Sequence, residues 1–392
     1  MKKVVLAFSG GLDTSFCAKH LSRDKGYEVV AVSVNTGGFS KQDALDLESR
    51  AKGLGVSEFH FIDETENFYQ EGVKYLLFGN VLKNNTYPLS VSAERVFQAV
   101  AIANKAVELE AHAIAHGSTG AGNDQIRFDM IFESLCPGME IITPIRDLSL
   151  SRKQEIEYLV ESGVNFDWEK AKYSINKGLW GTSVGGKETL TSDEYLPEEA
   201  FPSSLKREKP VAIDIGFDSG EPCSLDGKSL SPVNLILELT KICEEYAIGR
   251  DIHVGDTIVG IKGRVGFEAG APLILIKAHH SLEKHVLTKN QLFIKDQLSQ
   301  FYGQMMHEGQ YLDPAMRDME AYLNKSQENV TGTVQVYLAP YRFHVQGIHS
   351  QFDLMHSKFG TYGEENNMWT GDDARGFAKI WANQTKLINS IK

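Results

Sequence analysis

Five short apolar segments alternate with helix-like segments over the first 165 residues, and this alternation is the strongest constraint on the fold. The apolar segments are residues 3–8, 28–35, 58–62, 112–116 and 140–143. Strands this apolar, separated by helices, are typical of a parallel sheet covered by helices on both faces. Ligands of such sheets lie beyond the carboxyl ends of the strands. We therefore predict an N-terminal α/β domain with a ligand site at that edge.

The pattern changes after Gly163. A stretch with three prolines, residues 192–210, predicts a long loop, and the segments after it mix strand-like and helix-like patterns. We expect strands at 210–217, 257–263 and 272–280 and a helix at 233–248. The expected division is an α/β domain over residues 1–165, an α+β domain over 166–370 and a terminal helix over 371–392.

The terminal helix is amphipathic. Asp372 and Asp373 at its start complement the helix dipole. One side carries the apolar residues Phe377, Ile380, Trp381, Ile388 and Ile391. A helix of this kind has to pack against something, and two partners stay open: its own domain and a neighbouring subunit.

Charge and hydropathy exclude several classes of function. The formal net charge of −12 argues against a sequence-independent nucleic-acid binder, which needs a basic face. No apolar run approaches the ~20 residues that span a membrane. The N-terminus lacks the small-residue cleavage site of a secretory signal. We expect a cytoplasmic protein that binds small polar ligands, with neither nucleic acid nor a membrane among its partners.

Neither the cysteines nor the histidines predict a metal site. The cysteines stand far apart, which favours reduced and mostly buried thiols over a zinc or redox motif; they are Cys17, Cys136, Cys223 and Cys243. His279, His280 and His285 form a cluster. However, adjacent histidines in a strand point to opposite faces, and no carboxylate completes a ligand set.

The first strand runs directly into AFSGGLDTS, residues 7–15. Two glycines between a strand and a helix present backbone N–H groups and the positive end of a helix dipole, which together bind anions. Ser9, Thr14 and Ser15 add hydroxyl donors. The loop lacks the Gly-Lys-Ser/Thr end of P-loop NTPases and the G-x-G-x-x-G of dinucleotide folds. SGGLDTS resembles the signature of the N-type ATP pyrophosphatases, whose loop grips the departing pyrophosphate.

A second motif, HGSTGAGNDQIRF at residues 116–128, follows the fourth predicted strand. Its three glycines allow a tight turn. Thr119, Asn123, Asp124 and Arg127 contribute a hydroxyl, an amide, a carboxylate and a guanidinium. This mixture suits a zwitterionic amino acid, whose carboxylate is bound by Arg or N–H groups and whose ammonium is bound by a carboxylate. The alternative is a capping network at the start of the following helix.

With two later motifs, these segments resemble the argininosuccinate synthases over essentially the whole chain. The later motifs are YSINKGLWGTSVGG, residues 173–186, and SQENVTGTVQVYL, residues 326–338. The resemblance implies an ATP-dependent ligase in which the ureido oxygen of citrulline attacks the α-phosphorus, pyrophosphate leaves, and the aspartate amine displaces AMP. It also implies a nucleotide-binding domain, a synthetase domain and a C-terminal oligomerisation helix in a homotetramer, with Mg²⁺ accompanying ATP.

The resemblance assigns site residues position by position. The ATP loop would comprise Ala7, Phe8, Ser9, Gly10, Gly11, Leu12, Asp13, Thr14 and Ser15, with Gly117 close to the nucleotide. Aspartate would be held by Thr119, Asn123 and Asp124, and citrulline by Tyr87, Ser92, Asn123, Arg127, Ser174 and Ser183. Asp124, Arg127 and Asp13 are the expected catalytic residues. Asp124 is a candidate base for the aspartate amine, and Asp13 either caps the helix or orients Mg²⁺.

Several positions depart from the family pattern. The Glu and Tyr that the family places in its citrulline pocket align with Gly255 and Phe267, and the lysine of its Gly-Lys-Gly aligns with Ala121. The family's Asp-Glu-Asn is Asn176-Lys177-Gly178 in this chain. If that Glu faces the α-ammonium of citrulline, its loss leaves the charge without a partner. Either Asp256 or another acid takes over, or the substrate is an N-acylated citrulline, such as N-acetyl- or N-succinylcitrulline.

Other classes of enzyme that have a similar glycine loop fit the sequence less well. The tRNA-thiolating ligases need basic surface and reactive cysteines, and GMP and NAD synthetases need a glutaminase. A non-catalytic nucleotide or amino-acid sensor is the alternative from a different class. Retention of the whole SGGLDTS loop together with Asn123, Asp124 and Arg127 speaks against a sensor, because a sensor could lose its grip on pyrophosphate.

Overall fold

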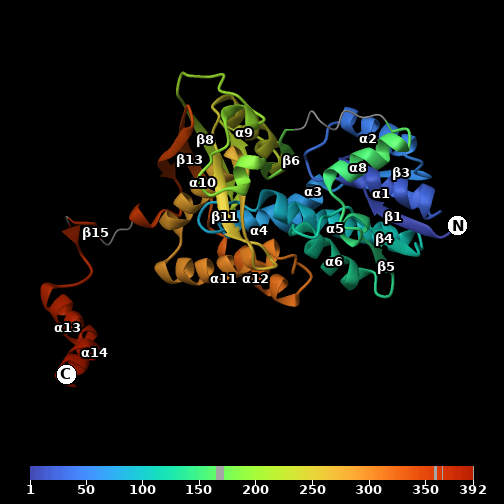
Figure 1. Ribbon diagram of the computed structural model, residues 1–392. Coiled ribbons are helices and arrows are strands. Elements are labelled where there is room, and N and C mark those ends of the chain that lie inside the picture. The colour runs from blue at the N-terminus through green and yellow to red at the C-terminus, as the bar shows by residue number, and fades with distance from the viewer. Residues whose placement is uncertain (165–171, 357–359, 364, 392) are drawn as a thin grey trace.

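The computed structural model describes residues 1–164, 172–356, 360–363 and 365–391, and its first domain is built on a parallel sheet (Figure 1). The sheet has five strands in the order β3-β2-β1-β4-β5, and every neighbouring pair is parallel. Its strands are β1 (Lys3–Ala7), β2 (Glu28–Asn35), β3 (Glu58–Asp63), β4 (Ala113–Ala115) and β5 (Glu140–Ile142). The five predicted strands are confirmed.

Helices cover both faces of this sheet. Val4 and Leu6 of β1 pack in one apolar cluster with Phe16 and Leu159, whereas Val5 packs in a second cluster on the opposite face. Because both faces are buried, the strands are apolar throughout rather than alternating. The helices of this part are α1 (Leu12–Lys19), α2 (Lys41–Gly53), α3 (Thr65–Phe68), α4 (Lys74–Phe78), α5 (Ser90–Glu108), α6 (Asp124–Leu135), α7 (Pro144–Asp147) and α8 (Arg152–Glu161).

In the described residues, the second part of the chain contains two sheets that are larger than its last strand pair. It also contains four helices that precede the chain end. One sheet has the strand order β10-β9-β8-β13-β14 and the other β11-β12-β7-β6. The strands are β6 (Ser174–Gly178), β7 (Gly181–Gly185), β8 (Val211–Asp218), β9 (Glu221–Leu225), β10 (Lys228–Ser229), β11 (Arg250–Asp256), β12 (Lys262–Glu268), β13 (Gly332–Ala339) and β14 (Arg342–His349), followed by the short pair β15 (Gly360–Thr361) and β16 (Glu365–Asn366). The helices are α9 (Pro232–Glu245), α10 (Gly270–Val286), α11 (Lys289–His307) and α12 (Pro314–Ser326).

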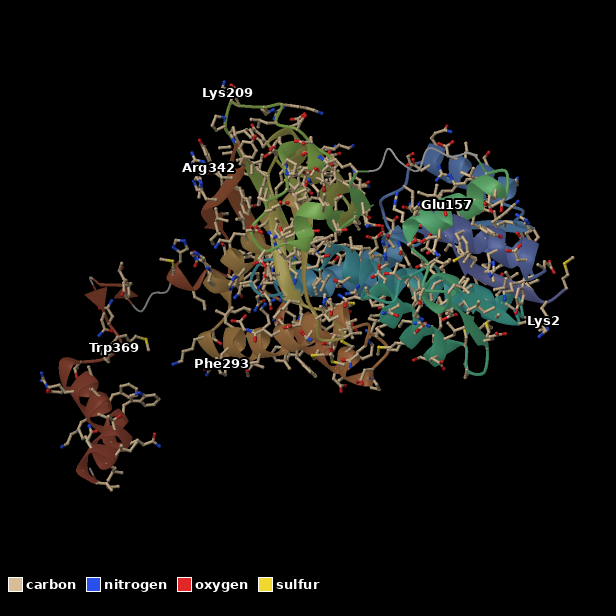
Figure 2. The ribbon with its side chains drawn as sticks, in the orientation of Figure 1. Lys2, Glu157, Lys209, Phe293, Arg342 and Trp369 are labelled. Atoms are coloured by element: carbon tan, nitrogen blue, oxygen red, sulfur yellow. The ribbon has the colours of Figure 1, made fainter. Side chains whose placement is uncertain are left out.

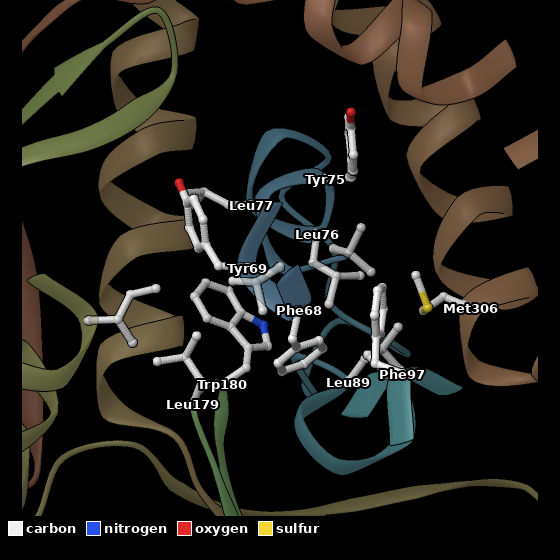
Figure 3. Packing of buried hydrophobic residues seen from close by; sticks show 14 of the residues in the cluster. Phe68, Tyr69, Tyr75, Leu76, Leu77, Leu89, Phe97, Leu179, Trp180 and Met306 are labelled. Carbon is white, nitrogen blue, oxygen red and sulfur yellow. The ribbon is translucent and has the colours of Figure 1, made fainter. Parts of the chain in front are cut away.

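One apolar core joins the two parts (Figure 3). Phe68 and Tyr69, which precede α4, pack in the same cluster as Phe97 of α5, Trp180 and Met306 of α11. The indole N–H of Trp180 donates to the carbonyl of Pro88 over 3.0 Å. The start of α5 is therefore held against the second part of the chain. The predicted boundary between residues 165 and 166 lies outside the described residues.

Two predicted strands are wrong. Residues 272–280 lie inside helix α10, whose apolar residues pack on several sides against α9, α4 and β13. A short run of Leu and Ile does not by itself distinguish a buried helix from a buried strand. The predicted strand at 257–263 is mostly the turn between β11 and β12. His279 and His280 therefore lie on a helix, and His279 contacts Asn80 and Gln327.

The chain end forms two helices, α13 (Gly371–Trp381) and α14 (Asn383–Ile391), which stand away from the rest of the molecule (Figure 1). Trp369 lies on the segment that leads to them (Figure 2). Neither helix has a buried residue, and the side chain of Trp381 is 77% exposed. The apolar side of this arm therefore does not pack on its own domain.

Among the described residues, no helix is both long and apolar enough to cross a membrane.

Candidate active site

The glycine loop joins β1 to α1 at the carboxyl edge of the sheet. Gly10 has φ +72°, a conformation that favours glycine, and a side chain there would collide with Leu47 of α2. Gly11 is the N-cap of α1 and no side chain caps this helix, so the predicted capping role of Asp13 is wrong. Ser9 Oγ lies 3.2 Å from Thr14 Oγ1 and accepts from the backbone N–H of Gly11 over 3.4 Å. Ser9 and Gly11 are exposed just before the first turn of α1, in which Asp13 and Thr14 are half-buried.

Several loop residues are buried beneath this surface. Ala7, Phe8 and Leu12 belong to the apolar clusters of the sheet. Ser15 is fully buried, and its hydroxyl group has no hydrogen-bond partner among the described residues. The groups that the loop exposes are therefore Ser9, Gly11 and part of Thr14.

The loop after β4 packs directly on the first turn of α1. β1 and β4 are neighbours, with Leu6 opposite Ala115. A side chain at Gly117 would lie 3.2 Å from the backbone carbon of Asp13 and the backbone nitrogen of Thr14. The two glycine motifs, about a hundred residues apart in the sequence, therefore form one edge of the sheet. Thr119 lies exposed on this second loop.

Asp124, at the start of α6, lies between two guanidinium groups. It accepts from Nε of Arg95 over 3.1 Å and from Nη1 of Arg127 over 2.7 Å. Burial alone would raise its pKa, but the charges of Arg95 and Arg127 hold the pKa of Asp124 below its ordinary value. A carboxylate with a lowered pKa is a weak base and a strong partner for cations.

Asn123 does not cap α6 with its side chain, which argues against a simple capping network. Its Oδ1 instead accepts from the backbone N–H of Ile258 over 2.8 Å, in the turn between β11 and β12. The second part of the chain therefore reaches over the loop that carries Asp124.

Arg127 is buried and fixed by His307. Its Nε donates to the carbonyl of His307 over 2.9 Å, and its Nη2 lies 3.4 Å from Nδ1 of the same residue. Burial and the neighbouring charges of Arg127 and Lys83 lower the pKa of His307 to about 3. The imidazole is therefore neutral and adds no charge beside Arg127, whose guanidinium is paired with Asp124.

Tyr87 and Ser92 both lie at the start of α5. The Tyr87 hydroxyl oxygen accepts from Ser90 Oγ and from the backbone N–H of Val91, each over 3.1 Å. The ring of Tyr87 stacks on His253 with centroids 5.2 Å apart and contacts Phe267 at 5.4 Å. Both Tyr87 and Ser92 are buried. The hydroxyl hydrogen of Tyr87 stays free to donate, because these contacts use only its oxygen.

Ser174 and Ser183 lie on neighbouring strands. Ser183 of β7 stands directly opposite Asn176 of β6 and Phe267 of β12. Ser183 is buried, whereas Ser174 is exposed near the start of β6. This sheet therefore brings Ser183 and Phe267 together with Tyr87, and Ser174 stays at its rim.

His253 occupies the space beside Gly255. Both face the same side of β11, and a side chain at Gly255 would lie 2.6 Å from Nε2 of His253. Burial, followed by the charge of Lys83, lowers the pKa of His253, and its Nδ1 has no hydrogen-bond partner among the described residues. Asp256 points to the other side, exposed and 2.6 Å from Lys262. The β11–β12 pairing is regular, so Asp256 does not replace the missing carboxylate.

A cavity of about 390 Å³ opens at the carboxyl ends of β2 and β3, at the same edge of the sheet as the glycine loop. Its wall includes Asn35, whose Nδ2 donates to Asp63 over 3.3 Å, and the rings of Phe39 and Phe61. None of these residues was predicted from the sequence to belong to the site. The cavity leaves room for part of a ligand beyond the glycine loop.

Two family models match nearly all of this chain. Residues 3–165 match the arginosuccinate synthase N-terminal HUP domain, and residues 173–388 match the arginosuccinate synthase C-terminal domain. The chain belongs to the argininosuccinate synthase family. This family catalyses the ATP-dependent ligation of citrulline and aspartate in arginine biosynthesis, and the chain is a ligase of this class.

Curated argininosuccinate synthases are similar to the chain over almost its full length. The protein of Methanocaldococcus jannaschii is 37% identical over 364 residues, 92% of each chain. The protein of Dictyoglomus turgidum is 35% identical over 388 residues, which is 98% of this chain and 97% of the relative. The Bacillus subtilis protein is 35% identical over 401 residues, covering 100% of this chain and 97% of the relative.

Three residues that contact the predicted site residues were not themselves predicted from the sequence. Arg95, His253 and His307 contact Asp124, Tyr87 and Arg127, respectively. None of them belongs to a motif, and each contact joins segments far apart in the sequence. Only the charge of Arg95, five residues after the buried start of α5, could have suggested a buried partner.

Proposed function

We propose that the chain ligates citrulline to aspartate with the residues gathered at this edge of the parallel sheet. The observation that carries the proposal is the packing of Gly117 on the first turn of α1, which joins the glycine loop to the motif that also contains Asp124 and Arg127. A site for the pyrophosphate of ATP then adjoins a site for two amino acids. The family membership of the chain supports the same reaction.

The proposed roles follow from charge and position. The backbone N–H groups of Leu12, Asp13 and Thr14, in the first turn of α1, would bind the leaving pyrophosphate at the positive end of this helix. Arg127, held by His307, would bind a substrate carboxylate together with the hydroxyl groups of Tyr87, Ser92 and Ser183. Thr119 and Asn123 would hold aspartate. Ser174 would complete the citrulline pocket at its rim.

Asp124 is proposed to orient charges rather than to remove a proton. Both of its oxygens already accept from guanidinium groups, and its pKa is lowered. It would fix Arg95 and Arg127 and attract the ammonium group of aspartate. Catalysis would then rest mainly on positioning and charge stabilisation.

Mg²⁺ is proposed to arrive with ATP. Among the described residues, no group of three or more His, Cys, Asp or Glu side chains is arranged to hold a metal ion. The phosphate oxygens of ATP are strong ligands for Mg²⁺. The ion would therefore belong to the substrate.

The test is isotope transfer. The purified chain is incubated with ATP, Mg²⁺, aspartate and citrulline whose ureido oxygen is ¹⁸O. Attack of that oxygen on the α-phosphorus moves the label into AMP, with one pyrophosphate and one argininosuccinate formed. Unlabelled AMP would contradict the mechanism. Nucleotide binding with no product would favour the sensor.

A second candidate substrate, an N-acylated citrulline, is favoured by one observation. The neutral imidazole of His253 fills the space beside Gly255, and Asp256 faces the other way. Lys83 is a charged group near both His253 and His307, and Arg127 and Asp124 also lie near His307. Position 255 itself offers no carboxylate to a substrate ammonium group, whereas an acylated nitrogen carries no charge and needs none.

Substrate competition separates the two candidates. Pyrophosphate release is measured with free, N-acetyl- and N-succinylcitrulline. For the acylated candidate, we expect kcat/KM to favour an acylated form, and the double variant His253→Ala, Gly255→Glu to shift preference toward free citrulline by about tenfold or more. Val254→Glu adds a carboxylate on the opposite face of β11 as the matched control. Preference for free citrulline in the unaltered chain would remove this candidate.

Assembly, domain division and location are also proposals. We propose a homotetramer held by α13 and α14, supported by the exposed apolar side of this arm. We propose that residues 1–165 bind the nucleotide, that 166–370 form the synthetase domain and that 371–392 serve assembly. A cytoplasmic location is supported by the four free cysteines and by ATP as a substrate.

A further inference from the structure

The second glycine loop, residues 117–122, is held on its buried side by the side chain of Gln125. Gln125 lies in the first turn of α6 and is 5% exposed. Its Nε2 donates to the carbonyl of Gly120 over 2.6 Å and to the carbonyl of Gly122 over 3.2 Å. Both hydrogens of one buried amide group therefore hold two carbonyl groups of the same loop.

Arg146 of α7 fixes the orientation of this amide group. Its Nη1 donates to Oε1 of Gln125 over 3.3 Å, so the amide oxygen faces Arg146 and the amide nitrogen faces the loop. The same Nη1 donates to Oδ2 of Asp129 over 2.6 Å, and Nε donates to Oγ1 of Thr143 over 3.2 Å. Arginine has no acceptor, so the reversed amide would set two donors against each other. The guanidinium therefore directs the amide N–H groups at the loop.

The start of the loop depends on the same ion pair. Oδ1 of Asp129 lies 2.9 Å from Nε2 of His116, and the backbone N–H of Ser118 donates to Nδ1 of His116 over 3.2 Å. Because Nδ1 accepts a hydrogen bond, Nε2 carries the proton and donates to Asp129. His116 is 1% exposed. The pair of Asp129 and Arg146 therefore supports both ends of the second glycine loop.

These contacts decide which backbone groups the loop presents on its other side. In a trans peptide, the carbonyl group and the following N–H group point in opposite directions, and the described residues contain no cis peptide bond. The carbonyl groups of Gly120 and Gly122 face Gln125. The N–H groups of the next residues, Ala121 and Asn123, therefore point away from it. Neither N–H group has a hydrogen-bond partner among the described residues.

We propose that Gln125 and Arg146 are positioning residues of the aspartate site: they turn the N–H groups of the second glycine loop toward a carboxylate group of aspartate. This inference rests on the proposed role of Thr119 and Asn123 in holding aspartate. Two N–H groups without a partner and the hydroxyl group of the exposed Thr119 suit a carboxylate, which only accepts hydrogen bonds. A reversed peptide in the loop would present a carbonyl oxygen instead, and the two acceptors would repel.

Gln125→Met removes the hydrogen bonds and keeps the packing. Methionine has a similar length and volume but no donor, so the carbonyl groups of the loop lose their partners. We expect the Kd for aspartate to rise about tenfold or more, and KM for ATP to stay within about twofold. A side chain that only filled space would leave both constants unchanged. Gln297→Met, at an exposed position of α11, is the matched control.

Arg146→Lys breaks the same support from its other end. Lysine keeps the charge that pairs with Asp129, but an ammonium group cannot also keep the contacts with Gln125 and Thr143. We expect the Kd for aspartate to rise about threefold or more. Since Arg146 then acts through Gln125, the double variant should bind aspartate no more weakly than Gln125→Met alone. Effects that multiply would show that the two residues act independently and would overturn the inference.

The experiment measures aspartate binding to the full chain by calorimetry, with ATP and Mg²⁺ present and citrulline absent, so that no ligation takes place. Equal Kd values for the unaltered chain and Gln125→Met would overturn the inference. Thermal unfolding of each variant shows whether it is folded. Arg146→Lys, at a side chain that is 30% exposed, carries the test if Gln125→Met does not fold.

Product formation is measured separately, with KM for ATP taken from pyrophosphate release. Weaker aspartate binding in Gln125→Met, with no product from citrulline or its acylated forms in the unaltered chain, would support the inference and reject the proposed ligation. An unaltered chain that forms product but has the same KM for aspartate as Gln125→Met would keep the proposed function and overturn the inference. An unaltered chain that binds no aspartate would overturn both.

Discussion

Arg95 donates a hydrogen bond from Nη2 to Oδ1 of Asn176 over 2.9 Å, which ties helix α5 to strand β6. The same guanidinium contacts Asp124 through Nε and Gln98 through Nη1. One side chain therefore joins the two parts of the chain at the candidate active site. Asn176 is one of the positions where the sequence departs from the family pattern, and it supplies an acceptor for Arg95.

The first prediction concerns Asn176. Asn176→Ala should lower the free energy of unfolding by about 1.5 to 3 kcal/mol, because a hydrogen bond to a charged group is lost. It should also raise KM for citrulline, since β6 is no longer tied to α5. Urea denaturation and steady-state kinetics measure the two effects. Asn176→Asp keeps the acceptor and is the control; Asn176→Ala with unchanged stability would contradict the prediction.

The second prediction concerns Arg127. Arg127→Lys cannot reproduce the contacts with Asp124 and both groups of His307, because an ammonium is a single point donor. We expect kcat/KM for citrulline to fall about 30-fold or more, as for truncation of a buried charged pair. Arg342→Lys on β14 is the control (Figure 2). A loss equal to that of the control would argue against a role in binding.

The third prediction is a pH dependence of stability that arises from Glu94. Its carboxyl group is buried and accepts from Thr36 and from Gln98. Burial raises the pKa of Glu94 to about 7, even though Arg95 and Thr36 lower it. The folded state therefore holds a proton that the unfolded state loses near pH 4.5. This contribution is complete below that pH and is lost as pH rises through about 7.

The expected change is a loss of about 3 kcal/mol of unfolding free energy between pH 4.5 and pH 8 from this group. Glu94→Gln should remove that part of the pH dependence. Urea denaturation at several pH values measures it, and Glu133→Gln, at an exposed position of α6, is the control. The same slope in both variants would show that Glu94 does not hold the proton.

The fourth prediction concerns the terminal arm. Phe377 and Trp381 stack at 5.4 Å on the exposed side of α13, and no residue of α13 or α14 is buried. Removing the residues after Asp373 should lower the mass of the assembly, because the apolar side of this arm is then absent from the interface. Light scattering measures the mass. An unchanged mass would reject this interface.

The parallel sheet and the glycine loop could be predicted because their causes are local in the sequence. Five apolar segments separated by helices leave few arrangements other than a covered parallel sheet. Gly10 permits the positive φ that turns the chain into α1. Helix α10 could not be predicted in the same way. Its Leu-Ile-Leu-Ile run fits a buried strand or a buried helix equally well, and packing on several sides decides between them.

The motif residues of the candidate site could be proposed from the sequence, but the residues that hold them in place could not. Asp124 and Arg127 come from one continuous segment, so both could be proposed from the sequence. His307, which fixes Arg127, is 180 residues away, so only the folded chain shows the contact. The departure at Gly255 was visible in the sequence, but nothing there showed that His253 fills the space.

The sequence by itself determined the fold class, the glycine-rich edge of the parallel sheet and the family, because each depends on local patterns of apolar residues, glycines and short motifs. The tertiary structure alone decided which residues meet: Arg95 with Asn176, Arg127 with His307, and His253 beside Gly255. The physical reason is distance. Hydrogen bonds, burial and like-charge contacts act over a few ångströms between side chains, and only the packing of helices and sheets brings these residues that close.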